Sequence, residues 1–92
     1  MSDAPKPLLL EAQELIDGDR QSQYGDPYTC HVRVARLWSV ILGTEVTAIE
    51  VNMCMIALKM ARLVNNPTDK DGWLDIAGYA GLSQKILERE PL

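Results

Sequence analysis

Phenylalanine is absent from this chain of 92 residues, and cysteine occurs only at Cys30 and Cys54. Neither cysteine has a neighbouring cysteine or a histidine pair at the spacing of a zinc site. Each falls within a helical apolar pattern, where a free thiol behaves as a small hydrophobic group. The sequence therefore predicts two buried thiols in a reducing compartment.

The chain also lacks an excess of basic residues and a long apolar run. Nine Lys and Arg stand against thirteen Asp and Glu, for a net charge of -4. This balance has the wrong sign for binding a phosphate backbone, so nucleic acid is not an expected partner. The uncharged run at 51–58 has eight residues, whereas a membrane span needs roughly 20. Because Glu11 directly follows Leu8–Leu10, we expect no signal peptide and a cytoplasmic protein.

What is present is the composition of a small globular protein. Apolar residues make up 47% and charged residues 24% of the sequence. The length suits a single core, so we expect one domain over 1–92, with a flexible N-terminus over 1–6.

Apolar residues recur at helical spacing in four segments. The first is expected from Leu8 to Gly18, and the second from Asp26-Pro27 to about Gly43. The third begins at the capping box Thr47-Ala48-Ile49-Glu50 and ends at Asn65-Asn66-Pro67. The fourth follows Thr68 and Asp69 and stops before Pro91. The residues expected to face inward are Val34, Leu37, Trp38 and Ile41 in the second segment and Trp73, Ile76, Ala77, Ala80, Ile86 and Leu87 in the fourth.

These segments predict an all-α fold resembling a four-helix bundle. The third is apolar nearly all round, and three short neighbours have little surface with which to cover it. We therefore expect a homodimer that completes the bundle. The alternative is a compact monomer in which Met53, Met55 and Met60 fill gaps in the core.

Polar residues are few in the apolar segments, so their positions carry information. Asn52, Lys59 and Arg62 share one stripe of the third helix, and Asp75 and Tyr79 share one face of the fourth. We expect these to form one polar site with three residues from the segment between the first two helices, and its members are Arg20, Tyr24, Asp26, Asn52, Lys59, Arg62, Asp75 and Tyr79. The structural alternatives are an ion-pair network that fixes helix register and a solvated helix face.

No residue is predicted to be catalytic or to bind a metal. His31 is the sole histidine, and a partly buried core position explains it better than a role as general base. Arg33 and Arg36 are expected to face water. Glu11-x-x-Glu14 could form half of a magnesium site with Asp71 and Asp75. The second pair has a spacing of four residues instead of three, so a solvated helix face is the preferred interpretation.

Several strings in the sequence resemble a family of small helical domains encoded by bacteriophages and prophages. They are Asp19-Arg20, Tyr24-Gly25-Asp26-Pro27, Ala35-Arg36-Leu37-Trp38, Leu58-Lys59-Met60-Ala61-Arg62-Leu63 and Trp73-Leu74-Asp75-Ile76-Ala77-Gly78-Tyr79-Ala80. This family is a domain of unknown function, so the resemblance implies a viral origin and no particular reaction. A more distant similarity is to helical domains associated with nucleotide modification. Cys30 and His31 depart from the Asn-Phe expected after the loop.

Two functions follow as hypotheses. The first is a small non-enzymatic protein that binds a bacterial host protein during infection, with a helical or coiled-coil protein as one possible partner. The second is a nucleotide site in which Lys59, Arg62 and Arg20 hold phosphates, with Mg²⁺ as cofactor only in that case. A MazG-like nucleoside-triphosphate pyrophosphohydrolase ranks below both. The sequence favours the first hypothesis, with no cofactor.

Overall fold

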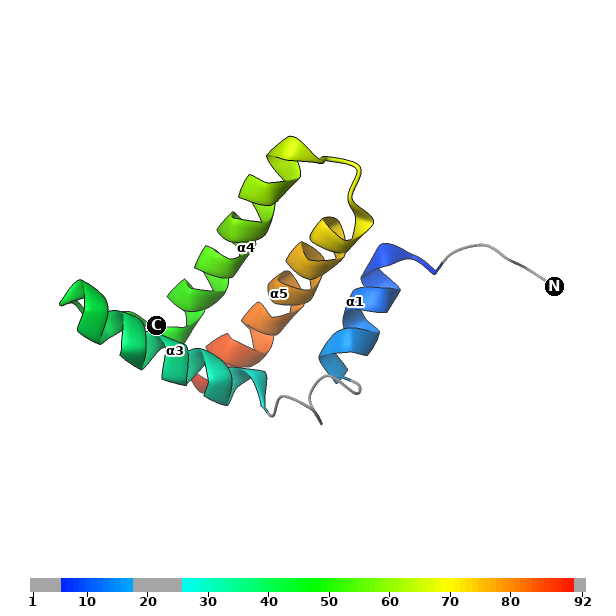
Figure 1. The fold of residues 1–92 in the computed structure, drawn as a ribbon. Helices are drawn as coiled ribbons and strands as arrows, with labels where there is room; N and C mark the ends of the chain where they lie inside the picture. Colours follow the sequence, from blue (N-terminus) through cyan, green and yellow to red (C-terminus); the bar gives the residue numbers. More distant parts are fainter. Residues whose placement is uncertain (1–5, 18–25, 91–92) are drawn as a thin grey trace.

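The computed structural model describes residues 6–17 and 26–90. In this part of the chain there are four α-helices and no strand, which confirms the all-α prediction. The helices are α1 (Leu8–Asp17), α3 (Pro27–Leu42), α4 (Ala48–Asn65) and α5 (Lys70–Arg89). Helices α4 and α5 form an antiparallel hairpin, α1 lies beside α5, and α3 crosses the end of the hairpin (Figure 1).

The helix ends lie where the local sequence predicts them. Asp26 precedes Pro27 at the start of α3, and Gly43 ends that helix with a φ of 71°, a left-handed conformation that favours glycine. At the start of α4, the Thr47 side chain accepts a hydrogen bond from the Glu50 backbone N–H, and the Glu50 carboxylate accepts one from Thr47. The predicted capping box is therefore confirmed.

A second cap at α4 comes from the far end of the chain. The Glu90 carboxylate accepts hydrogen bonds from the backbone N–H groups of Ala48 and Ile49, at 3.2 and 3.1 Å. These two donors belong to the first turn of α4 and have no partner within the helix. Glu90 thus satisfies both, places its negative charge at the helix N-terminus and ties the end of α5 to the start of α4.

Glycine allows α5 to approach its neighbours on two sides. A Cβ atom at Gly72 would lie 2.7 Å from Leu63 of α4, and one at Gly81 would lie 2.5 Å from Ile16 of α1. Ion pairs reinforce the α1 contact, because Lys70 meets Glu11 at 2.9 Å and Lys85 meets Asp17 at 2.8 Å. Glu11 is half-buried, so the prediction that it lies on a solvated face is wrong.

The core is small, and several predictions of burial are wrong. The buried apolar residues of the described chain are Ala12, Ala35, Ala48, Ile49, Val51, Leu63 and Ile86. Of the residues expected to face inward, five are exposed instead: Leu37, Ile41, Trp73, Ala80 and Leu87. The periodicity identifies one face of each helix, but in a single chain no described element covers those positions. Cys30 and Cys54 are also exposed, so the prediction of two buried thiols is wrong.

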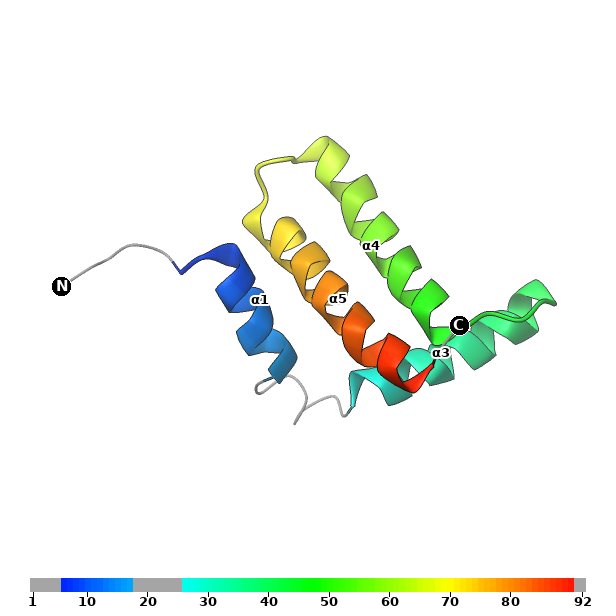
Figure 2. The ribbon, with the colours of Figure 1, turned by 180° about the vertical axis from the view of Figure 1, so that it is seen from behind.

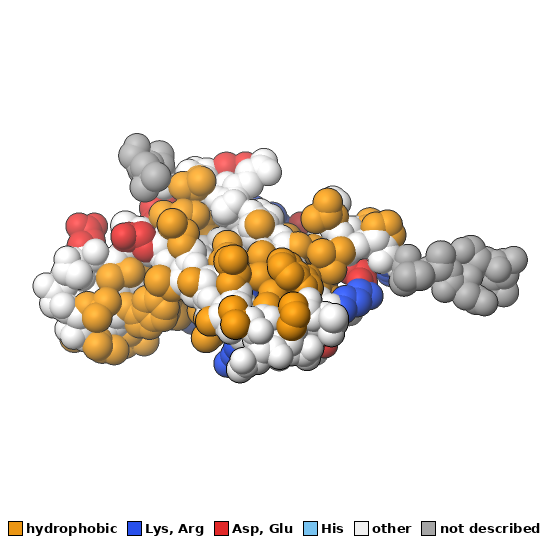
Figure 3. Space-filling view, turned by 90° about the horizontal axis from the view of Figure 1, so that it is seen from above, with side chains coloured by type: hydrophobic (Ala, Val, Ile, Leu, Met, Phe, Trp, Pro, Cys, Tyr) orange, Lys and Arg blue, Asp and Glu red, His pale blue; other side chains and the backbone are white. Residues whose placement is uncertain are grey.

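Figure 3 looks down on the molecule and shows hydrophobic side chains over much of this surface, both at the projecting end of α3 and above the hairpin. None of the described helices is both long and apolar enough to span a membrane.

Replacement of Glu90 by alanine tests the long-range cap. We expect Glu90→Ala to lower the free energy of unfolding by about 1 kcal/mol, the usual cost of losing an N-cap acceptor, which corresponds to a fall in Tm of roughly 4–8 °C. The matched control is Glu88→Ala, because the Glu88 carboxylate accepts a hydrogen bond from Gln84 within the same helix. Equal effects of the two substitutions in thermal unfolding would contradict the cap.

Candidate functional site

Four of the eight predicted site residues come together along the α4–α5 interface. Lys59 Nζ lies 2.9 Å from Asp75 Oδ2, and both side chains are more than two-thirds buried. Two turns back along α4, the Asn52 side-chain amide donates a hydrogen bond to the backbone carbonyl of Tyr79 at 2.8 Å. The stripe on α4 and the face on α5 therefore meet.

Asn52 also joins the hairpin to α3. Its side-chain oxygen lies 3.1 Å from Nε2 of His31, and the other ring nitrogen of His31 lies 2.8 Å from the Pro27 carbonyl. The ring centroids of His31 and Tyr79 are 6.3 Å apart. Both His31 and Asn52 are buried. This agrees with the core position predicted for His31. The sequence gives no signal for the pairing of His31 with Asn52, because the two residues are 21 positions apart.

Asp26 does not join this cluster. Its carboxylate pairs with Arg89 and accepts a hydrogen bond from Thr29. Arg89 is fourteen residues beyond Asp75 on α5, or about 21 Å along a helix axis. Partial burial alone would raise the pKa of Asp26, but hydrogen bonds from Arg89 and Thr29 and the charge of Arg89 outweigh it and lower the pKa below its ordinary value of 3.8. The ion pair and the side-chain hydrogen bond of Asp26 are therefore with Arg89 and Thr29, which are not among the predicted site residues.

Arg89 has a second partner that sequence reasoning missed. Its guanidinium carbon lies 5.3 Å from the centre of the Tyr28 ring, and Tyr28 packs against the core formed by Ala48, Ile49 and Ile86. Tyr28 is therefore not an isolated surface ring. The pair connects the start of α3 to the end of α5, which no local pattern indicates.

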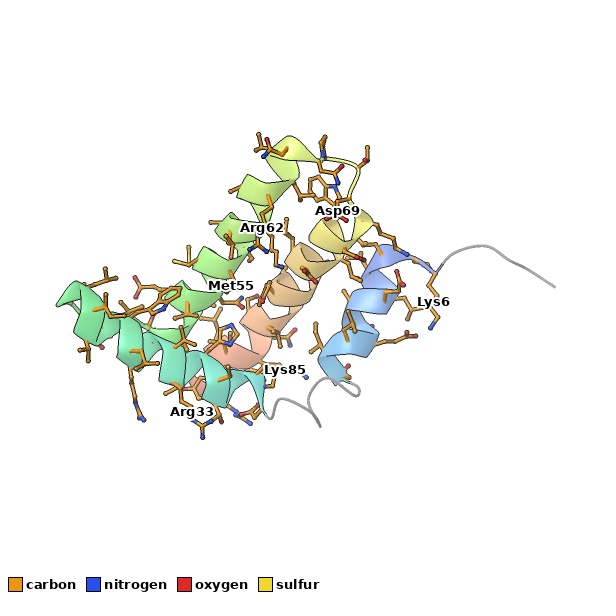
Figure 4. The ribbon with its side chains drawn as sticks, in the orientation of Figure 1. Lys6, Arg33, Met55, Arg62, Asp69 and Lys85 are labelled. Carbon is orange, nitrogen blue, oxygen red and sulfur yellow. The ribbon has the colours of Figure 1, made fainter. Side chains whose placement is uncertain are left out.

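The remaining predicted residues lie elsewhere. Arg62 is exposed, one turn beyond Lys59 on α4, and Figure 4 shows it on the front of that helix. Arg20 and Tyr24 lie outside the described residues. Arg33 and Arg36 are exposed as predicted, and Arg33 points away from the other helices in Figure 4.

The polar residues between α4 and α5 are better placed to hold the helices in position than to bind a ligand or catalyse a reaction. Lys59 and Asp75 neutralise each other, and Asn52 uses both its donor and its acceptor within the fold. Within residues 6–17 and 26–90, no three His, Cys, Asp or Glu side chains are grouped so that they could hold a metal ion. Of the two structural alternatives, the network that fixes helix register fits this geometry better than the solvated face.

Removal of the Asn52 amide should destabilise the fold. Asn52→Ala leaves a buried His31 ring nitrogen without its partner, at about 1–3 kcal/mol. It also removes one hydrogen bond to the Tyr79 carbonyl, which keeps its bond within α5. The control Asn65→Ala changes an exposed residue at the end of the same helix and should cost less than about 0.5 kcal/mol. Urea denaturation measures both, and a cost for Asn52→Ala as small as that of the control would refute the structural role.

Acid should weaken the contact between α3 and α5. Because the pKa of Asp26 is lowered in the folded chain, the ionised carboxylate stabilises the fold above its unfolded value of 3.8. This stabilisation is lost as the pH falls through the lowered pKa. Asp26→Asn should therefore reduce the loss of stability on going from about pH 5 to pH 3, as measured by urea denaturation at each pH. An unchanged pH dependence in Asp26→Asn would contradict the ion pair.

Comparison with known proteins identifies a family for this chain and two similar phage proteins. Residues 7–87 match the family model described as "Domain of unknown function (DUF6378)". The chain is 42% identical over 80 residues to the Gene 55 protein of Mycobacterium phage L5, covering 86% of this chain and 51% of that protein. It is 40% identical over 85 residues to the Gene 55 protein of Mycobacterium phage D29, covering 92% and 56%.

The chain thus spans about half the length of these relatives. No solved structure matches it. Both relatives are phage proteins, which supports the phage origin that the sequence predicts. The extent of the family match, over most of the length of the chain, places this protein in the DUF6378 family.

Proposed function

We propose that this chain is a non-enzymatic binding module that acts on a bacterial host protein during infection, as a homodimer. The observation that carries the proposal is the projecting end of α3. Leu37, Val40, Ile41 and Leu42 are between 64% and 83% exposed there. Four such side chains at the end of one helix have a high cost of exposure to water, which a partner would remove.

The spacing of these residues suggests how a partner binds. Leu37, Val40 and Ile41 stand at positions i, i+3 and i+4, the pattern with which a helix enters an apolar groove. Arg33 lies one turn before Leu37 and is exposed, so it falls at the rim of such a contact. The expected partner is therefore a protein with an apolar groove bordered by acidic side chains.

The phage relatives favour this reading by analogy, since small phage proteins often act by binding a host protein. The polar cluster gives less support to a nucleotide site, because Lys59 is already paired with Asp75. The two hypotheses make opposite predictions about ligands and about α3, and both can be tested with purified protein.

A binding experiment with a variant at the end of α3 tests the proposal. The immobilised chain should retain a host protein that, once identified and purified, binds the wild type with a measurable Kd. Ile41→Glu should weaken that binding at least about tenfold, equivalent to about 1.4 kcal/mol. Leu9→Glu, a change at a similarly exposed residue of α1, is the control and should bind as the wild type does.

Two results would contradict the proposal. One is equal affinity of Ile41→Glu and the wild type for the purified partner. The other is a rise in Tm with a nucleoside or deoxynucleoside phosphate, with or without Mg²⁺ or Mn²⁺, because a specific ligand at a hundred times its Kd adds about 2.7 kcal/mol. That second result would favour the nucleotide hypothesis.

A further inference from the structure

An uncovered apolar row runs along α4. This helix turns Asn52, Lys59 and Leu63 towards α5. About a quarter turn away lie Met53, Ala57, Met60 and Val64, and all four are exposed. Their spacings of four, three and four residues are those of a seam between packed helices, yet no described helix covers them.

A matching row runs along α5. This helix meets α4 through Gly72, Asp75 and Tyr79, and a quarter turn away lie Trp73, Ile76, Ala80 and Leu87. All of these except the half-buried Ile76 are exposed. Because the two helices are antiparallel, a quarter turn in the same sense leads to the same side of the hairpin. Figure 2 views this side, and no described helix lies in front of α4 or α5 there.

The two rows form one face without charge, which we call the hairpin face: Met53, Ala57, Met60, Val64, Trp73, Ile76, Ala80 and Leu87. The charged residues within 53–64 and 73–87 are Lys59, Arg62, Asp75 and Lys85. Lys59 and Asp75 pair with each other between the helices, and Lys85 pairs with Asp17 of α1. Arg62 lies on the front of α4 in Figure 4, the side opposite to that seen in Figure 2. All four charged side chains therefore lie off the hairpin face. Solvated helix faces normally carry charged side chains, so this face is built for contact.

We propose that a second copy of this chain covers the hairpin face, so that two α4–α5 hairpins form a four-helix bundle about a twofold axis. A twofold interface must be self-complementary, and an antiparallel hairpin with a heptad-like seam packs on its own copy in this way. The surface assignment rests on the proposed dimeric form. It leaves the projecting end of α3 free in each copy.

The available area agrees with a dimer. Met53, Met60, Val64, Trp73 and Leu87 are between 39% and 81% exposed. At about 150 Å² for each large residue, they leave roughly 400 Å² of apolar surface, to which the exposed alanines between them add. A standard interface takes about 800 Å² from each partner, about 65% of it apolar in a homodimer. One hairpin face therefore supplies most of the apolar area that one partner contributes.

Sedimentation equilibrium of the full chain tests this assignment. The wild type should have twice the monomer mass of 10.3 kDa at micromolar concentration. Met60→Glu places a charge at the middle of the hairpin face and should raise the dimer Kd at least about 100-fold. Ile41→Glu changes an apolar residue of greater exposure on α3 and should leave the dimer Kd unchanged.

A second variant and a second measurement guard against misfolding. Ala80→Lys adds a charge to the α5 row and should also give a monomer, with far-ultraviolet circular dichroism showing retained helix.

In a Trp38→Phe background, fluorescence reports Trp73 alone, and its emission should shift to the blue as the protein concentration rises. A monomeric wild type at millimolar concentration would overturn the proposal. So would dissociation by Ile41→Glu combined with an intact dimer in Met60→Glu, because the second copy would then bind α3 instead.

The dimer measurements and the host-binding measurements together distinguish the dimer through the hairpin face from the host contact through the end of α3. Loss of host binding in Ile41→Glu with an intact dimer supports both proposals. An intact host contact in a monomeric wild type would refute the dimer alone, and a dimer whose host binding does not depend on Ile41 would refute the host contact alone.

Discussion

The fold depends on one buried amide. Asn52 is 1% exposed and bonds to His31 on α3 and to the backbone of Tyr79 on α5. A buried amide needs a partner for each of its groups, so the two bonds fix both the register of the hairpin and the position at which α3 crosses it. In a domain with so small a core, this constraint determines which side of α4 faces α5, and hence which side remains bare.

The distribution of polar and apolar groups then explains the surface. Ion pairs and hydrogen bonds are concentrated between the helices and at their ends, where Lys59 meets Asp75 and Glu90 caps α4. Most of the exposed large apolar side chains lie on the hairpin face and at the end of α3, and the others are Leu9, Leu10 and Leu15 on α1 and Leu58 on α4. Exposed apolar surfaces of this extent are typical of contact sites, which is why we propose that association with a second copy completes the structure. In the proposed arrangement a second copy covers the hairpin face and a host protein covers the end of α3.

Local signals predicted the helices well, because capping and turn residues act within a few positions. The capping box at Thr47 and Glu50, Pro27 at the start of α3 and Gly43 at its end are examples. Apolar periodicity located the faces of α4 and α5 but could not tell whether they are covered by the same chain. Trp73 and Leu87 were therefore expected to be buried and are exposed. Pairs distant in sequence, such as Asp26 with Arg89, carry no local signal, and so the polar cluster was only partly predicted.

In the proposed dimer, the bare hairpin face is the interface between the two copies. Isotope-filtered nuclear Overhauser spectroscopy on a mixture of methyl-labelled and unlabelled chains detects such contacts directly. We expect intermolecular signals between the methyl groups of Met53 and Met60 in one copy and protons of the hairpin face in the other. Intermolecular signals confined to Leu37, Val40 and Ile41, or no intermolecular signal at millimolar concentration, would contradict the proposed dimer.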